Sequence, residues 1–83
     1  MDIKDVVVES CKKVIKENNE KINVTEETEI SIENGIDSLG IVTIIFEIEE
    51  QLEIELDEYL SYVRRCKTIG DLIGVVEKAN EKL

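Results

Sequence analysis

Apolar residues three and four positions apart recur along most of this 83-residue chain, and no proline interrupts them. That spacing puts side chains on one face of an α-helix, whereas a strand requires alternation every second residue. A short chain with no proline, and with no Asn-Gly or Asp-Gly pair at hairpin spacing, favours helices over a sandwich or a barrel. We therefore expect an all-α fold, in one small domain over residues 1–83.

The two helices expected first differ in how apolar they are. Residues 3–16 have one apolar face, made by Ile3, Val6, Val7, Cys11, Val14 and Ile15. The second helix is predicted to start at Asp37 or Ser38 and to end near Leu52. Apolar residues fill more than half of its circumference, so we expect it at the centre of the fold, with neighbours on several sides.

Two further helices follow, and the first of them is short. Residues 57–63 are predicted to form it and to bury Leu60 and Val63. The last helix opens at Thr68, because Asp71 three residues later makes a capping-box-like pair with it. Its apolar stripe is Ile69, Leu72, Ile73, Val76 and Ala79. Three longer helices and a short third one predict a small four-helix bundle.

A long connection over residues 19–36 separates the first two helices. Ile30 and Ile32 alternate as in a strand, but a strand without a partner is not stable. We expect an ordered loop instead, with Val24, Ile30 and Ile32 packed against the helices. Ordered loops of this length are often functional.

The net charge of −10 is concentrated in the middle of the chain. Residues 24–63 contain twelve acidic residues and no basic one. Such a field repels nucleic acid and anionic membranes and attracts basic protein surfaces, and it predicts a salt-sensitive fold. No apolar run is long enough to span a membrane, and the N-terminus lacks a signal-peptide pattern. We expect a soluble, cytoplasmic protein that neither binds nucleic acid nor inserts into membranes.

The chain has two cysteines and no histidine, which argues against a metal centre or a catalytic thiol. Cys11 falls on the apolar face of the first helix, so we expect a buried thiol. Cys66 follows two arginines, which would lower its pKa if it is exposed. Glutamates 47, 49, 50, 53 and 55 lack the glycine-centred loop of a calcium site, so no specific metal site is expected.

Ser38 stands where the loop becomes the apolar second helix, in the sequence Asp37-Ser38-Leu39. A nucleophilic role would need a base, and there is no histidine and no lysine between residues 22 and 66. Asp37 or Ser38 is a candidate helix cap. A helix N-terminus also suits a phosphate ester on Ser38, although Asp37 would repel it. These two interpretations of Ser38 remain open from the residues alone.

The stretch GIDSLGIVTIIFEIEEQLEIEL, residues 35–56, resembles the acyl carrier protein family. The resemblance implies that Ser38, flanked by Asp37 and Leu39, carries 4′-phosphopantetheine taken from coenzyme A. It implies a monomeric carrier with no catalytic residues, which forms acyl thioesters for fatty acid or specialised polyketide or lipid synthesis. Its partners would be a phosphopantetheinyl transferase and acyl synthases or transferases with basic patches. A peptidyl or aminoacyl (D-alanyl-type) carrier is an alternative, and an acidic helical protein-interaction domain is an alternative of another class.

The resemblance also implies which residues meet the partners and the cargo. The docking surface would be the second helix, at Gly40, Thr43, Glu47 and Glu50. Gly40 and Thr43 stand where fatty-acid carriers usually have acids, and Arg64 and Arg65 extend the third-helix segment. These departures point to a specialised carrier. The acyl pocket would be lined by Val42, Phe46, Leu60, Val63 and Ile69.

Overall fold

The structure, a computed structural model, describes residues 2–18 and 23–81. Within these ranges the chain forms four α-helices, and it forms no strand there. They are α1 (Ile3–Asn18), α2 (Ser38–Leu52), α3 (Leu60–Arg65) and α4 (Ile69–Glu81), with two short 3-10 turns, η1 (Ile32–Asn34) and η2 (Asp57–Tyr59). The predicted all-α bundle, with three longer helices and a short third one, is confirmed.

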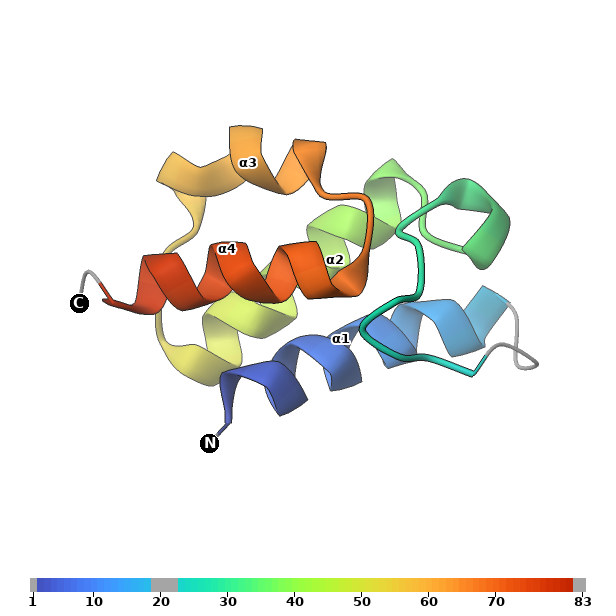
Figure 1. The fold of residues 1–83 in the computed structure, drawn as a ribbon, viewed down its shortest axis with the longest axis horizontal. Coiled ribbons are helices and arrows are strands. Elements are labelled where there is room, and N and C mark those ends of the chain that lie inside the picture. The colour runs from blue at the N-terminus through green and yellow to red at the C-terminus, as the bar shows by residue number, and fades with distance from the viewer. Residues whose placement is uncertain (1, 19–22, 82–83) are drawn as a thin grey trace.

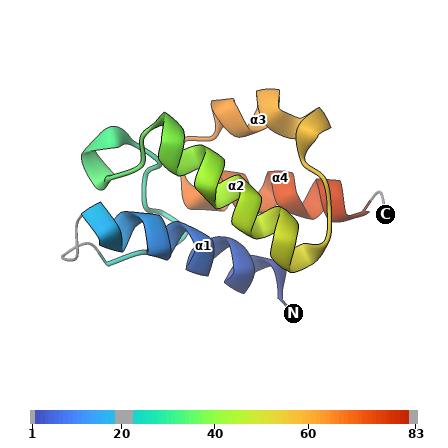
Figure 2. The same cartoon turned by 180° about the vertical axis from the view of Figure 1, so that it is seen from behind.

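Helix α1 packs against both α2 and α4, and α3 packs against α4. Figure 1 shows α4 in front of α2, with α1 below them and α3 above. From behind, α2 crosses the whole molecule between α1 and α3 (Figure 2). The largest fully buried side chains come from all three long helices and the α2–α3 connection: Ile15, Ile44, Ile48, Leu56, Ile69 and Leu72. The predicted apolar faces of α1 and α4 form this core, and Cys11 is buried in it as expected.

The described part of the long connection, residues 23–37, is tied to the segment before α4. Glu29 and Thr68 form an isolated antiparallel bridge. The Ile30 amide donates to the Lys67 carbonyl at 2.8 Å, and the Ile69 amide donates to the Thr28 carbonyl at 3.0 Å. Residues 23–37 form no strand, and residues 19–22 of the predicted loop lie outside the described residues.

The residues that hold this connection differ partly from the expected ones. Val24 is buried and Ile30 is half-buried, as predicted. Ile32 is 79 % exposed, so its predicted packing against the helices is wrong. It lies in the turn η1, which directs its side chain away from the core, and the buried Ile36 replaces it as the anchor.

Helix α2 is less enclosed than its composition predicts. Leu39, Val42 and Phe46 are 76 %, 48 % and 65 % exposed. The physical reason is the short α3, whose six residues pack against α4 and do not cover this side of α2. Leu60, expected to be buried by α3, is likewise 37 % exposed, whereas Val63 is buried.

The cap predicted for α4 is present. The Asp71 carboxylate accepts hydrogen bonds from the backbone amides of Lys67 and Thr68, at 3.0 and 3.2 Å. The Thr68 hydroxyl accepts a bond from the Asp71 amide at 3.2 Å. These bonds hold the pKa of Asp71 below its usual value, and the bond from the Lys67 amide has the largest effect. The reciprocal bonds define the start of α4.

Candidate functional site

Ser38 is the first residue of α2, but it does not cap the helix. The cap is Asp37, which has extended backbone angles and whose Oδ1 accepts a hydrogen bond from the Gly40 amide at 2.8 Å. Ser38 is exposed, and none of the residues that the structure describes hydrogen-bonds with its hydroxyl. The capping role left open above therefore belongs to Asp37, and the Ser38 hydroxyl remains available.

The turn before Ser38 fixes the place at which α2 begins. Gly35 ends η1 with a φ of 90°, a left-handed conformation that favours glycine. The Ile36 amide then donates to the Ser31 carbonyl at 2.9 Å, and the Ile36 side chain is 3 % exposed. Ile36 is held in the core and Asp37 is bonded to the helix, and together they place Ser38 at the first position of α2.

Gly40 lies at the contact between α2 and α1 and is buried. A Cβ atom added here would be 3.0 Å from Val14 Cγ1 and 3.4 Å from Asp37 Oδ1. The prediction placed Gly40 on the docking surface, whereas the structure places it against α1. Its lack of a side chain lets the two helices approach closely beside Ser38.

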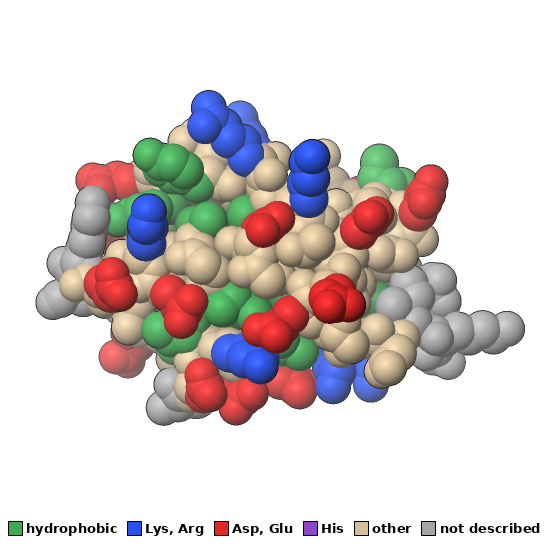
Figure 3. Space-filling model, viewed as in Figure 1, with side chains coloured by type: hydrophobic (Ala, Val, Ile, Leu, Met, Phe, Trp, Pro, Cys, Tyr) green, Lys and Arg blue, Asp and Glu red, His purple; other side chains and the backbone are tan. Residues whose placement is uncertain are grey.

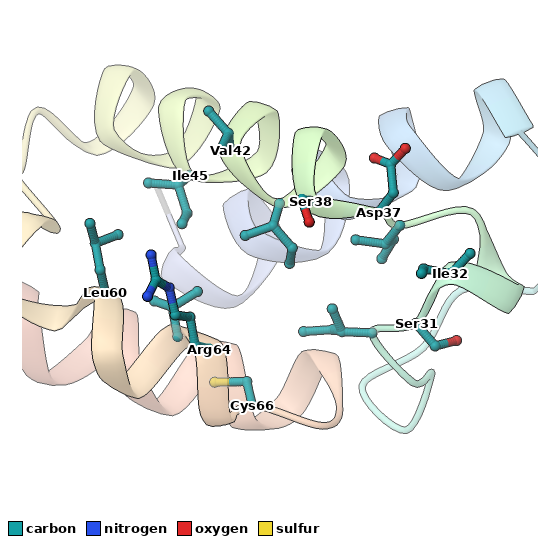
Figure 4. A pocket seen from close by; sticks show the side chains of 13 residues that line it. Ser31, Ile32, Asp37, Ser38, Val42, Ile45, Leu60, Arg64 and Cys66 are labelled. Atoms are coloured by element: carbon teal, nitrogen blue, oxygen red, sulfur yellow. The ribbon is translucent and has the colours of Figure 1, made fainter.

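A cleft of about 590 Å³ adjoins Ser38, between α2, α3 and the loop before α2. This volume is within the roughly 300–1,000 Å³ usual for small-molecule sites. Most of its wall is aliphatic: Ile30, Ile32, Ile36, Ile41, Val42, Ile45, Leu60 and Val63. Figure 4 shows the Ser38 hydroxyl directed toward this space. The cleft can shelter an apolar group attached at Ser38.

The wall formed by α3 and the residue after it adds two polar groups, Arg64 and Cys66. The Cys66 thiol donates to the Tyr62 carbonyl, with 3.4 Å between sulfur and oxygen. Burial is the main cause that raises the pKa of Cys66, and the negative charge of Asp71 raises it further. The expected lowering by neighbouring arginines is conditional on an exposed thiol, and Cys66 is half-buried, so desolvation raises its pKa instead.

The residues predicted for an acyl pocket are divided by the structure. Val42, Leu60 and Val63 line the cleft, whereas Phe46 points to solvent outside it and Ile69 is fully buried in the core. The prediction missed Ile41 and Ile45, three and seven residues after Ser38 on α2. It also missed Arg64, although Leu60, Val63 and Arg64 have the spacing of one helical face. These spacings were the available signal.

The residues predicted for docking are also in different environments. Glu50 and Thr43 are exposed, and the Thr43 hydroxyl donates to the Leu39 carbonyl at 3.0 Å. Glu47 pairs with Lys13 of α1 at 3.5 Å and accepts a bond from Gln51 at 2.9 Å. The hydrogen bond from Gln51 is the main cause that lowers the pKa of Glu47, and the positive charge of Lys13 lowers it further. The acid therefore links α1 to α2.

The described ranges, 2–18 and 23–81, contain neither a cluster of metal-ligating side chains nor a membrane-spanning helix. There, no group of three or more acidic or cysteine side chains is placed to hold a metal ion. In the same ranges, no helix is both long and apolar enough to cross a membrane.

Comparison with known proteins identifies the family. Residues 5–76 match the model of a family described as "Phosphopantetheine attachment site". The acyl carrier protein of Wolinella succinogenes is 32 % identical over 76 residues, which cover 92 % of this chain and 90 % of that protein. The acyl carrier protein of Thermotoga maritima is 29 % identical over 55 residues, 66 % of this chain and 65 % of that protein. No solved structure shows significant similarity.

Members of this family are carriers and not enzymes, and they bear a covalently attached 4′-phosphopantetheine group. The residues at the start of α2 fit such a group, since an exposed hydroxyl without a hydrogen-bond partner in the described structure opens onto an apolar cleft. The chain belongs to the acyl carrier protein family.

Proposed function

We propose that Ser38 is the attachment residue and that residues 1–83 act as one carrier domain, which presents acyl thioesters to biosynthetic enzymes. The observation that carries this proposal is the division of roles at the start of α2. Asp37 caps the helix, so the Ser38 hydroxyl has no hydrogen-bond partner among the described residues and is exposed beside the apolar cleft.

The modification requires a separate transferase, because the described chain offers no base to Ser38. A bond forms between Ser38 Oγ and the phosphorus that carries the pantetheine chain of coenzyme A. The pyrophosphate bond of coenzyme A breaks, adenosine 3′,5′-bisphosphate leaves, and the serine proton passes to a base of the transferase. The attached arm ends in a thiol, which forms thioesters with acyl groups.

The cleft supports an acyl cargo over an aminoacyl one. Its wall is mostly Ile, Leu and Val, and each methylene of a chain buried there contributes about 0.8 kcal/mol. An amino group would lose its water against this aliphatic wall, in which Asp37 is the one acid. We therefore favour an acyl carrier over the peptidyl or aminoacyl alternative.

We further propose that partners dock on the exposed side of α2. Leu39, Val42 and Phe46 are three and four residues apart, so they form a continuous apolar stripe that begins beside Ser38. Glu50 lies one turn beyond Phe46 and supplies exposed negative charge, while the carboxylate of Glu47 forms an ion pair with Lys13. An enzyme with an apolar hollow and a basic rim fits this surface. This revises the acidic surface expected from the sequence.

Neither Thr43 nor Gly40 provides the negative charge that fatty-acid carriers usually have at the matching positions. This supports a dedicated set of partner enzymes, for a polyketide or another specialised lipid. A monomeric state and a cytoplasmic location remain predictions.

The test is the intact mass of the folded protein after incubation with coenzyme A, Mg²⁺ and a broad-specificity phosphopantetheinyl transferase. The parent should gain the mass of one phosphopantetheine group, and Ser38→Ala should gain none. Ser61→Ala is the matched control, because Ser61 is also exposed and helical but lies on α3. Modification of Ser38→Ala, or no modification of the folded parent, would refute the assignment and favour the acidic interaction domain.

A further inference from the structure

Arg64 is the one basic side chain among the residues that line the Ser38 cleft. On α3 it lies four residues after Leu60 and directly after Val63, and all three side chains line the same wall. Figure 4 shows its side chain extending from α3 toward α2, between Leu60 and Ser38. The guanidinium group is therefore presented to whatever occupies the cleft.

The position of this charge is unusual for the chain. Arg64 is the first basic residue after a segment, residues 24–63, that has twelve acids and no base. On the face in Figure 3, basic side chains lie over α3, and others lie along α1 and near the end of α4 among acidic side chains. In the described ranges the ion pairs are Lys4–Glu26, Lys12–Glu9 and Lys13–Glu47, and Arg64 is in none of them. Within residues 2–18 and 23–81, its charge therefore has no ion-pair partner.

An oxyanion is the ligand chemistry that this arrangement suits. A guanidinium group offers a planar pair of donors that matches the oxygens of a phosphate or a carboxylate. The only acid of the cleft wall is Asp37, and its Oδ1 accepts the Gly40 amide across the helix start. The cleft thus has a cationic donor on one side and an aliphatic wall around it.

The proposed attachment at Ser38 would bring such an oxyanion to the same cleft. A phosphodiester on Ser38 Oγ has one negative charge, and it would stand beside the Asp37 carboxylate, which repels it. A cation across the cleft offsets that repulsion. Because the phosphodiester is tethered, its effective concentration near Arg64 is high, so even a weak pair is populated.

We propose that Arg64 binds the phosphodiester of the arm carried by Ser38 and thereby holds the first part of the arm between α2 and α3. This inference rests on the proposed attachment at Ser38. Arg64 acts here as a positioning residue, since the thioester chemistry takes place at the far end of the arm.

The experiment compares apo protein and protein loaded with the free-thiol arm, for the parent, Arg64→Gln, Arg64→Lys and Arg65→Gln. Arg65 is the matched control, because it is the exposed next residue of α3 and does not line the cleft. Intact mass first establishes the loading. The ³¹P resonance of the phosphodiester and the ¹⁵N–¹H resonance of Arg64 Nε are then measured, and backbone amide spectra establish that each variant is folded.

We expect loading to shift the Arg64 Nε–H resonance of the parent. Arg64→Gln should shift the ³¹P resonance, Arg64→Lys should shift it less, and Arg65→Gln should leave it unchanged. The difference in ³¹P shift between the parent and Arg64→Gln should become smaller as the salt concentration is raised to 1 M, where the Debye length is about 3 Å.

Several results would overturn the inference. Equal ³¹P shifts in Arg64→Gln and Arg65→Gln would indicate a general charge effect, and no shift in either would exclude a contact. A change of Arg64 Nε–H that appears only with a malonyl-loaded arm, and not with the free thiol, would indicate binding of a cargo carboxylate instead. Failure of the folded parent to gain the mass of the arm would refute the attachment itself, and the inference with it.

Discussion

Replacing Gly40 by alanine tests the close contact between α1 and α2 beside Ser38. In an ordinary helix this change stabilises by at most about 1 kcal/mol, because glycine has a low helix propensity. Here the new Cβ atom would stand 3.0 Å from Val14 Cγ1, and Val14 is itself buried. Overpacking of this kind costs about 1–3 kcal/mol. We expect Gly40→Ala to lower the free energy of unfolding, by up to about 2 kcal/mol.

Gly74→Ala is the matched control. Gly74 is in the interior of α4, and a Cβ atom there would meet nothing within 4 Å. The propensity effect then acts alone, so this variant should be more stable than the parent by about 0.5–1 kcal/mol. Urea denaturation followed by circular dichroism measures both variants, and the slope checks that the denatured state is unchanged.

A double-mutant cycle identifies the clash. Val14→Ala alone should cost about 2 kcal/mol, from two lost methyl groups and the cavity they leave. Adding Gly40→Ala to Val14→Ala should then cost nothing or stabilise, which gives a favourable coupling of about 1–3 kcal/mol. If Gly40→Ala stabilises the parent as much as Gly74→Ala does, the reasoning about this contact is wrong.

Three further predictions concern the cap of α4, the α2–α3 connection and the buried thiol. Because the pKa of Asp71 is lowered on folding from 3.8, its contribution is present above that pH and is lost as the pH falls through the folded value. Asp71→Asn should therefore be less stable than the parent at pH 7, with a difference that disappears in acid; an equal difference at all pH values would contradict this. Glu49 Oε2 accepts the Leu56 amide at 2.8 Å, so Glu49→Ala should cost about 1–3 kcal/mol in urea denaturation, whereas Glu50→Ala, at an exposed position, should be nearly neutral. Burial raises the pKa of Cys11 to about 12, so a thiol reagent at pH 8 should modify it only when the protein unfolds; rapid modification of native Cys11, detected by mass, would contradict its burial.

The helices could be predicted from the sequence because local signals agreed with one another. The Thr68–Asp71 pair marks the start of α4 whatever lies around it, since capping is a property of a few adjacent residues. The apolar face of α1 was predictable for the same reason, since residues at helical spacing share a face in any helix. Ser38 was singled out by its resemblance to a known family, and not by periodicity.

The exposure of individual residues was not predictable in the same way. Periodicity says which side chains share a face, but not whether another element covers that face. Phe46 belongs to the apolar side of α2, yet it is 65 % exposed because α3 is short and packs on α4. Gly40 has the opposite error: it was predicted on an exposed docking surface, whereas it is buried, and Val14 Cγ1 lies 3.0 Å from where its Cβ atom would be.

The start of α2 combines two requirements that act against each other. The helix needs an acceptor at its cap, and an aspartate there is among the best, typically worth about 1 kcal/mol. The same carboxylate repels the phosphodiester proposed for the next residue. If Ser38 itself were the cap, the carboxylate would not be needed, but the Ser38 hydroxyl would be engaged in capping and would not be free for the attachment. With Asp37 as the cap, the Ser38 hydroxyl has no hydrogen-bond partner among the described residues, and the proposed contact with Arg64 would offset the repulsion from the other side of the cleft. In this proposal the Asp37 cap and the Arg64 side chain act together at the attachment site. Loss of Arg64 should therefore affect the loaded protein and leave the apo protein almost unchanged.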